Sequence, residues 1–132
     1  MSAARPDETT TAIRPHEVIS DTMMDFELSK LVKNLSAEPQ QAGHTADTIV
    51  KYPDLRVVVI TMRKGAQLKE HRTAGSISVQ TISGHVTLRA AERTVDIPAG
   101  HLVTIAGDVP HSVEAVEDSA FLLTIAWREK AR

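Results

Sequence analysis

Two histidines, His71 and His111, are the residues of this sequence whose type and surroundings are best suited to chemistry. Imidazole is a common metal ligand and exchanges protons near neutral pH. A pair of imidazoles could therefore hold a metal, relay a proton, or bind an acidic or hydroxylated ligand. Other chemistries have less support, because the chain has no cysteine and shows no nucleophile elbow, P-loop or dinucleotide-binding glycine fingerprint.

The spacing around His71 resembles the first motif of the cupin family, which reads G, five residues, H-x-H, three or four residues, E, six residues, G. Gly65 and Gly84 occupy the two glycine positions, and His71 occupies the first histidine position. Thr73 stands in place of the second histidine, and Ile77 stands in place of the carboxylate.

The spacing around His111 is similar to the second cupin motif, which reads G, five residues, P-x-G-x-x-H, three residues, N. Gly100 and His111 match this motif. Ala106, Asp108 and Ala115 replace its proline, its second glycine and its asparagine. Two of the family's four metal ligands are therefore retained.

The resemblance is to small single-domain bacterial cupins of the RmlC-like type. It implies an all-β jelly-roll barrel, also called a double-stranded β-helix, with a short N-terminal helix. In this family the four motif ligands hold one divalent metal. Members include dioxygenases, isomerases, decarboxylases and binding or sensory domains without catalysis.

A metal is optional on this reading, because His71 and His111 form an incomplete ligand set. Gln80 is a candidate third ligand, although strand alternation turns it outward unless a bulge intervenes. One divalent ion (iron, nickel, manganese or zinc) and no metal are equally compatible with the sequence.

Strand alternation also predicts the wall of a ligand pocket around the two histidines. His71 is expected to share its face with Lys69 and Thr73, and the next strand is expected to face inward at alternate positions. The predicted pocket consists of His71, Thr73, Ile77, Val79, Thr81 and His111. The alternative is that both histidines are packed polar groups, hydrogen-bonded to Thr73, Thr81 or water.

The elements that position these residues divide the chain into four parts. We expect a flexible tail over 1–18, a helix and linker over 19–46, the barrel over 47–127, and a C-terminal tail over 128–132. The helix is expected to begin at Ser20 or Asp21, to end before Pro39, and to carry an apolar stripe. Eight or nine short strands are expected from residue 48 onward, separated by turns that include Gly65, Gly84 and Gly100.

Composition limits the partners of the chain. It has 132 residues, is 42% hydrophobic and carries a formal net charge of −2, which gives no reason to expect nucleic acid. No apolar run approaches the length of a membrane span, and the first residues lack the apolar core of a secretory signal. We therefore expect a cytoplasmic protein with no membrane partner.

Apolar residues on both faces of the strands near 55–63 and 120–127 predict that a second layer covers them. We expect a homodimer, with the N-terminal helix as the alternative cover. Two functions follow: a small-molecule-binding cupin acting as a sensor or accessory module, or a metal-dependent or acid–base enzyme of the isomerase or oxygenase type. A third hypothesis is a structural dimer with a packed barrel, and the sequence does not decide whether the chain is an enzyme.

Overall fold

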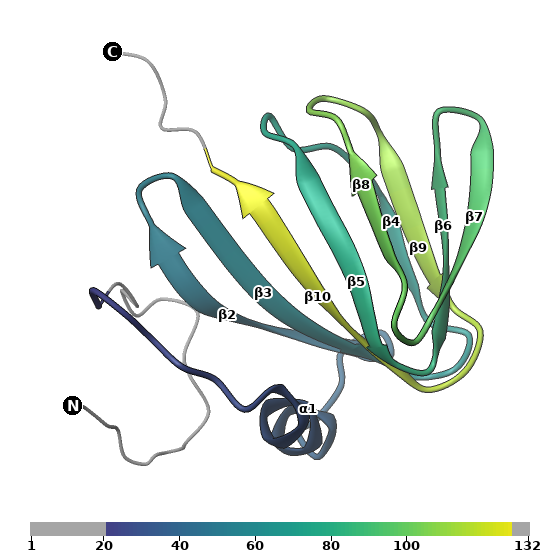
Figure 1. The fold of residues 1–132 in the computed structure, drawn as a ribbon. Helices are drawn as coiled ribbons and strands as arrows, with labels where there is room; N and C mark the ends of the chain where they lie inside the picture. Colours follow the sequence, from purple (N-terminus) through teal and green to yellow (C-terminus); the bar gives the residue numbers. More distant parts are fainter. Residues whose placement is uncertain (1–20, 128–132) are drawn as a thin grey trace.

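The computed structural model describes residues 21–127, which form one helix and nine strands (Figure 1). The predicted tails over 1–18 and 128–132 lie outside this range. The elements are α1 (Leu28–Ser36), β2 (His44–Tyr52), β3 (Leu55–Met62), β4 (Gln67–His71), β5 (Ile77–Ser83), β6 (His85–Ala90), β7 (Arg93–Pro98), β8 (Leu102–Ile105), β9 (His111–Ala115) and β10 (Ser119–Ala126).

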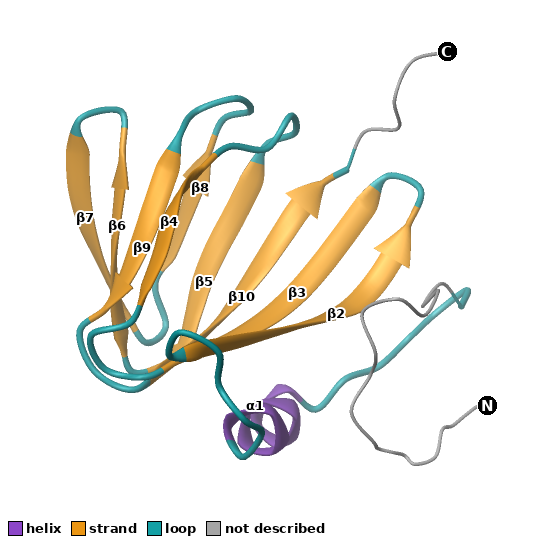
Figure 2. Ribbon diagram, turned by 180° about the vertical axis from the view of Figure 1, so that it is seen from behind, coloured by secondary structure: helices purple, strands orange, loops and turns teal. Residues whose placement is uncertain are grey.

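The strands form two antiparallel sheets. One sheet has five strands in the order β2-β3-β10-β5-β8, and the other has four in the order β4-β9-β6-β7. Sequence neighbours such as β3 and β4 therefore lie in different sheets, as expected for a jelly roll. Figure 2 shows the same two sheets from behind, with α1 as the only helix among the described residues. The predicted all-β jelly-roll fold is confirmed.

The main core lies between the two sheets. It consists of aliphatic side chains from both sheets with one aromatic residue, Phe121, which is 1% exposed. Val86 and Ile97, from the four-stranded sheet, are fully buried in it. This aliphatic filling fits a sequence in which only 3% of residues are aromatic.

A second core lies on the outer face of the five-stranded sheet, beneath α1. Val57 and Val59 of β3 pack there with Leu35 of the helix, while Val58 and Ile60 face the main core. Because successive side chains of β3 point to opposite faces of the sheet, this strand contributes residues to both cores. The apolar second face that predicted a homodimer is thus covered in part within the chain, by α1 and the segment before it.

The helix begins later than the sequence predicted. It starts at Leu28, after Glu27, whose side chain makes no capping hydrogen bond. Residues 21–27 are not helical, and Met24 and Phe26 pack on the second core with exposed Asp25 between them. This alternation is typical of an extended segment. The sequence prediction instead used the helical spacing of Met24 and Leu28, so it placed the start of the helix too early. The predicted end before Pro39 is confirmed, because α1 ends at Ser36.

The strands follow the predicted pattern, with one difference at the start. The first strand begins at His44, so residues expected to form a linker pair with β3 instead. The glycines of the motifs lie at turns, and Gly84 is the most constrained of them. It has a positive φ of 80°, and a Cβ atom there would lie 2.3 Å from the carbonyl oxygen of Asp118. Only glycine fits this contact between two turns.

Candidate functional site

His71 and His111 meet at one end of the barrel. His71 is the last residue of β4, His111 is the first residue of β9, and the two are direct cross-strand partners. Their ring centroids lie 4.4 Å apart, and the rings are inclined by 61° in an edge-to-face arrangement. Residues separated by 40 positions in the chain therefore form one pair of imidazoles.

A β-bulge places His71 on this face. Leu68 pairs with Val113 and His71 pairs with His111, so three steps along β4 match two steps along β9. The extra residue brings Leu68 and His71 to the same face, where Leu68 packs against the main core. Simple alternation grouped His71 with Lys69 and did not predict that it shares a face with Leu68; Lys69 and His71 are both exposed.

The backbone fixes the orientation of both rings in the same way. Nδ1 of His71 lies 3.0 Å from the carbonyl oxygen of Lys69, and Nδ1 of His111 lies 2.9 Å from that of Val109. A carbonyl can only accept, so each Nδ1 carries the proton and donates it to the residue two positions earlier. Nε2 is then the basic nitrogen of each neutral ring, the one a ligand or metal can use. The alternative interpretation placed Thr73, Thr81 or water against the rings, but the hydroxyl of Thr73 donates to Gly75 and that of Thr81 has no partner among the described residues.

One ring of the pair lies in the interior and the other at the surface. His111 is 4% exposed, whereas His71 is exposed at the rim of the barrel. Beside it, the loops before β5 and β9 are tied together, because the backbone N–H of Asp108 donates to the carbonyl oxygen of Thr73 at 2.7 Å. Asp108 adopts a φ of 65° at the position of the motif's second glycine. The loop thus keeps the backbone geometry of the motif with a different residue.

The structure brings only some of the predicted pocket residues near the histidines. Ile77 begins β5 at the end of the barrel where β4 ends, and both Ile77 and Val79 are buried in the main core. Thr81 is buried but lies four residues farther along β5, ~13 Å from Ile77 in an extended strand. Thr73 is half-buried in the loop, where its hydroxyl donates to the carbonyl oxygen of Gly75. The role of these residues in binding stays a prediction.

The donors near the histidine pair do not fit the four-ligand metal site of the family. Within the described residues, no three side chains among histidine, cysteine, aspartate and glutamate are grouped to hold an ion. Gln80, the candidate third ligand, is exposed on β5, between the buried residues Val79 and Thr81. It therefore lies on the outer face of the sheet and does not join the pair.

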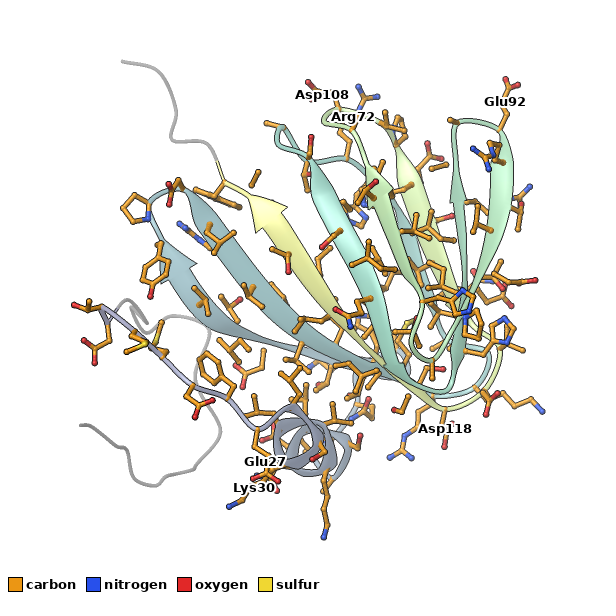
Figure 3. All side chains as sticks on the ribbon, viewed as in Figure 1. Glu27, Lys30, Arg72, Glu92, Asp108 and Asp118 are labelled. Carbon is orange, nitrogen blue, oxygen red and sulfur yellow. The ribbon has the colours of Figure 1, made fainter. Side chains whose placement is uncertain are left out.

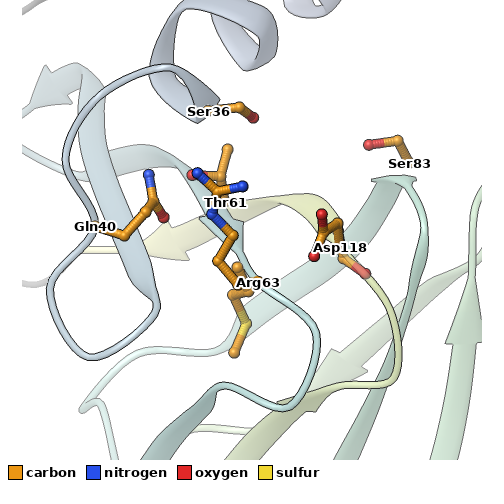
Figure 4. A pocket seen from close by; sticks show the side chains of 8 residues that line it. Ser36, Gln40, Thr61, Arg63, Ser83 and Asp118 are labelled. Atoms are coloured by element: carbon orange, nitrogen blue, oxygen red, sulfur yellow. The ribbon is translucent and has the colours of Figure 1, made fainter.

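A cavity that the sequence did not indicate lies at the other end of the barrel. It measures about 120 Å³ and lies between the C-terminal end of α1 and the base of the barrel (Figure 4). We call it the seam cavity. Figure 3 shows Asp118, one of its residues, at the end of the molecule opposite Arg72 and Asp108, which flank the histidine pair in sequence. Its lining residues are Ser36, Gln40, Thr61, Met62, Arg63, Ser83, Asp118 and Ser119.

None of the predicted pocket residues lines the seam cavity. Its residues come from four separate stretches of the chain and form no motif, so no sequence signal identifies them. The pairing of β10 with β3 and β5 brings most of them together, and the packing of α1 on the sheet adds Ser36 and Gln40.

The family model of the AraC-like ligand binding domain matches residues 57–129, more than half of the chain. The chain belongs to this family. The match begins within β3 and spans both histidines. Together with the fold, it places this AraC-like ligand binding domain among the cupins, and the predicted resemblance is confirmed. No curated protein matches the sequence.

Solved structures similar to this AraC-like domain include several cupins. A conserved protein of unknown function from Streptococcus pyogenes has a TM-score of 0.68 and 22% identity, over 92% of this chain and 98% of that one. A cupin superfamily protein from Desulfitobacterium hafniense has a TM-score of 0.68 and 9% identity, over 82% and 94%. Salicylate 1,2-dioxygenase from Pseudoaminobacter salicylatoxidans has a TM-score of 0.62 and 19% identity, over 75% of this chain and 30% of its own. At these identities the similarity shows the fold alone.

Proposed function

We propose that this chain is a small-molecule-binding cupin domain with a sensor or accessory role, and that the His71–His111 pair anchors its ligand. The observation that carries the proposal is the pair itself, with ring centroids 4.4 Å apart and both Nδ1 atoms held by backbone carbonyls. Membership in a family of ligand-binding domains supports it.

The geometry favours a ligand that presents hydrogen-bond donors to the two Nε2 atoms. Hydroxyl groups or a protonated acid meet this requirement, and so does a carboxylate when an imidazole is charged. Ile77, which replaces the carboxylate of the motif, adds an apolar surface at the same end of the barrel. The proposed ligand is therefore small and partly apolar, with polar groups that reach the imidazoles.

A metal is not required by this proposal. Two imidazoles without a third protein ligand form a weak site for iron, nickel, manganese or zinc. Elemental analysis of protein purified without a histidine tag tests this part, and the proposal expects well below one equivalent of metal. One full equivalent, retained after dialysis against a chelator, would contradict it.

The alternative function is an enzyme of the isomerase or oxygenase type acting on a small polar metabolite. The observation in its favour is that one imidazole is buried and its partner, 4.4 Å away, is exposed, so a proton could pass between the interior and the surface through the pair. The fold similarity to a dioxygenase is compatible with this alternative. Conversion of a bound compound, lost in both His71→Ala and His111→Ala, would establish it.

The homodimer and the cytoplasmic location stay predictions. Part of the outer face that suggested a dimer is covered by α1, whereas Val57 and Leu122 on the same face are only partly buried. Light scattering at tens of micromolar distinguishes a dimer from a monomer directly. In the described part of the chain, no helix is long and apolar enough to cross a membrane.

The binding proposal is tested by thermal denaturation with a panel of small sugars, hydroxy acids and aromatic acids. A ligand of the histidine pair should raise the melting temperature of the unchanged protein and have a smaller effect on His71→Ala and His111→Ala. His101→Ala is the matched control, because His101 is exposed and lies in the turn before β8. A ligand whose effect persists in both histidine variants would contradict the assignment.

A further inference from the structure

The seam cavity contains a buried hydroxyl group that the protein does not use. Thr61 lies near the end of β3 and is 3% exposed, yet within the described residues its Oγ1 has no hydrogen-bond partner. Thr61 lines the cavity, and its neighbours Val59 and Ile60 are apolar. An unpaired buried hydroxyl destabilises a protein, whereas valine of the same shape would not.

Gln40, which also lines the cavity, carries a second polar atom without a partner among the described residues. Its Nε2 donates to the carbonyl oxygens of Leu35 and Glu38, at 3.4 and 2.9 Å. This fixes the orientation of the amide, and the Oε1 atom is buried without a partner in the described part of the chain. Figure 4 shows Oε1 on the side of Thr61 and Arg63. Two residues that line the cavity thus each carry a buried polar atom without a partner among the described residues, an acceptor on Gln40 and a hydroxyl on Thr61.

Opposite charges complete the lining. Figure 4 shows the guanidinium group of Arg63 directed towards Thr61, with Asp118 on the other side of the cavity beside Ser83. Oδ1 of Asp118 already accepts a hydrogen bond from the backbone N–H of Lys64 at 2.8 Å. Arg63 is exposed, and a carboxylate is the group that the planar fork of a guanidinium binds best.

We propose that the seam cavity is a second binding site and that its ligand is a small hydroxy acid. The carboxylate would pair with Arg63 and accept a hydrogen bond from Thr61, and the hydroxyl would donate to Oε1 of Gln40 or to Asp118. A volume of about 120 Å³ holds about four water-sized groups, which suits an acid of two or three carbons. The site contains none of the residues of the histidine pair, so the two proposals stand independently.

Glycolate is the probe, added to the full-length ¹⁵N-labelled protein and followed by amide chemical shifts. The proposal expects saturable shifts at Gln40, Thr61 and Arg63, with the amides of His71 and His111 unchanged. Acetate lacks the hydroxyl group and glycerol lacks the carboxylate, and each should bind at least tenfold more weakly. Absence of saturable shifts at these residues up to tens of millimolar glycolate would overturn the proposal, and so would equal binding of glycerol.

Two variants with matched controls separate a binding role from a structural one. Arg63→Gln should weaken glycolate binding at least tenfold, whereas Arg89→Gln, at an exposed position of β6, should not change it. Thr61→Val should also weaken binding severalfold and should leave the melting temperature unchanged or raised, because the hydroxyl has no partner among the described residues. Thr94→Val, on the exposed face of β7, is its control. A lowered melting temperature in Thr61→Val, or unchanged binding in both site variants, would overturn the proposal.

Discussion

Nδ1 of His71 and Nδ1 of His111 each donate to the carbonyl oxygen two residues earlier, so the two cross-strand rings are held by the same backbone device. This bond fixes each ring and leaves its Nε2 available, to an organic ligand or to a metal alike. The two rings differ in exposure to solvent, because His111 is 4% exposed and His71 lies exposed at the rim of the barrel. The two histidines should therefore differ in their effect on stability and resemble each other in their effect on binding.

We predict that His111→Ala lowers the free energy of unfolding by ~1–3 kcal/mol, since it removes a buried, hydrogen-bonded side chain. His71→Ala should lower it by less than ~1 kcal/mol, because the ring is exposed. Each variant should weaken ligand binding about tenfold, the effect of losing one polar anchor. Urea denaturation measures the stabilities, and equal losses in the two variants would contradict the placement of the rings.

Gly84→Ala is expected to be among the most damaging small substitutions. The new methyl group would lie 2.3 Å from a backbone oxygen at a positive φ, which should lower the free energy of unfolding by ~2–5 kcal/mol. Gly100→Ala is the matched control, because Gly100 has a φ of 88° but no atom within 4 Å of the new methyl group. It should lose only ~1–2 kcal/mol. Similar melting temperatures for the two variants would argue against the contact between the turns.

The positions of these glycines illustrate what the sequence predicted well. Turn residues and alternating apolar residues set the strand boundaries to within a few positions, because both signals are local. The start of α1 was misplaced because Met24 fits a helical and an extended spacing equally, and packing on the sheet decided between them. The early start of β2 at His44 was likewise decided by pairing with β3.

Leu35 links α1 to the outer face of the five-stranded sheet. Leu35→Ala should lower the free energy of unfolding by ~2–4 kcal/mol, since Leu35 is 6% exposed in the second core. Lys33→Ala, exposed on the same helix, should change it by less than ~0.5 kcal/mol. If the two variants lost equally little stability, the packing of α1 on this face would contribute little. A dimer through this face would then be expected again.

Asp108 occupies a glycine position of the second motif with a φ of 65°. Asp108→Ala should lower the free energy of unfolding by ~1 kcal/mol, because alanine tolerates this conformation less well than aspartate. Asp108→Gly should be neutral or slightly stabilising by the same reasoning. Thermal denaturation of the three proteins checks the order, and a more stable alanine variant would show that the backbone there is not left-handed.

The candidate site was harder to predict than the fold for two physical reasons. The bulge between Leu68 and His71 changes which residues share a face, and no residue in that stretch marks it. The seam cavity depends on tertiary packing between Gln40, Thr61 and Asp118, which are distant in sequence. By contrast, the histidine positions could be found from motif spacing, because the turns before them are encoded locally.

The central claim is that the imidazoles of His71 and His111 bind the ligand of this domain, and imidazole nitrogen NMR tests it most directly. The experiment uses ¹⁵N-histidine-labelled protein that carries Thr61→Val and Arg63→Gln, which together weaken binding at the seam cavity. This variant is titrated with the compounds that stabilise it. We predict that the Nε2 resonances of both histidines shift on binding, while both Nδ1 atoms stay protonated and His101 is unaffected. A stabilising compound that leaves the Nε2 resonances of His71 and His111 unchanged would contradict the account.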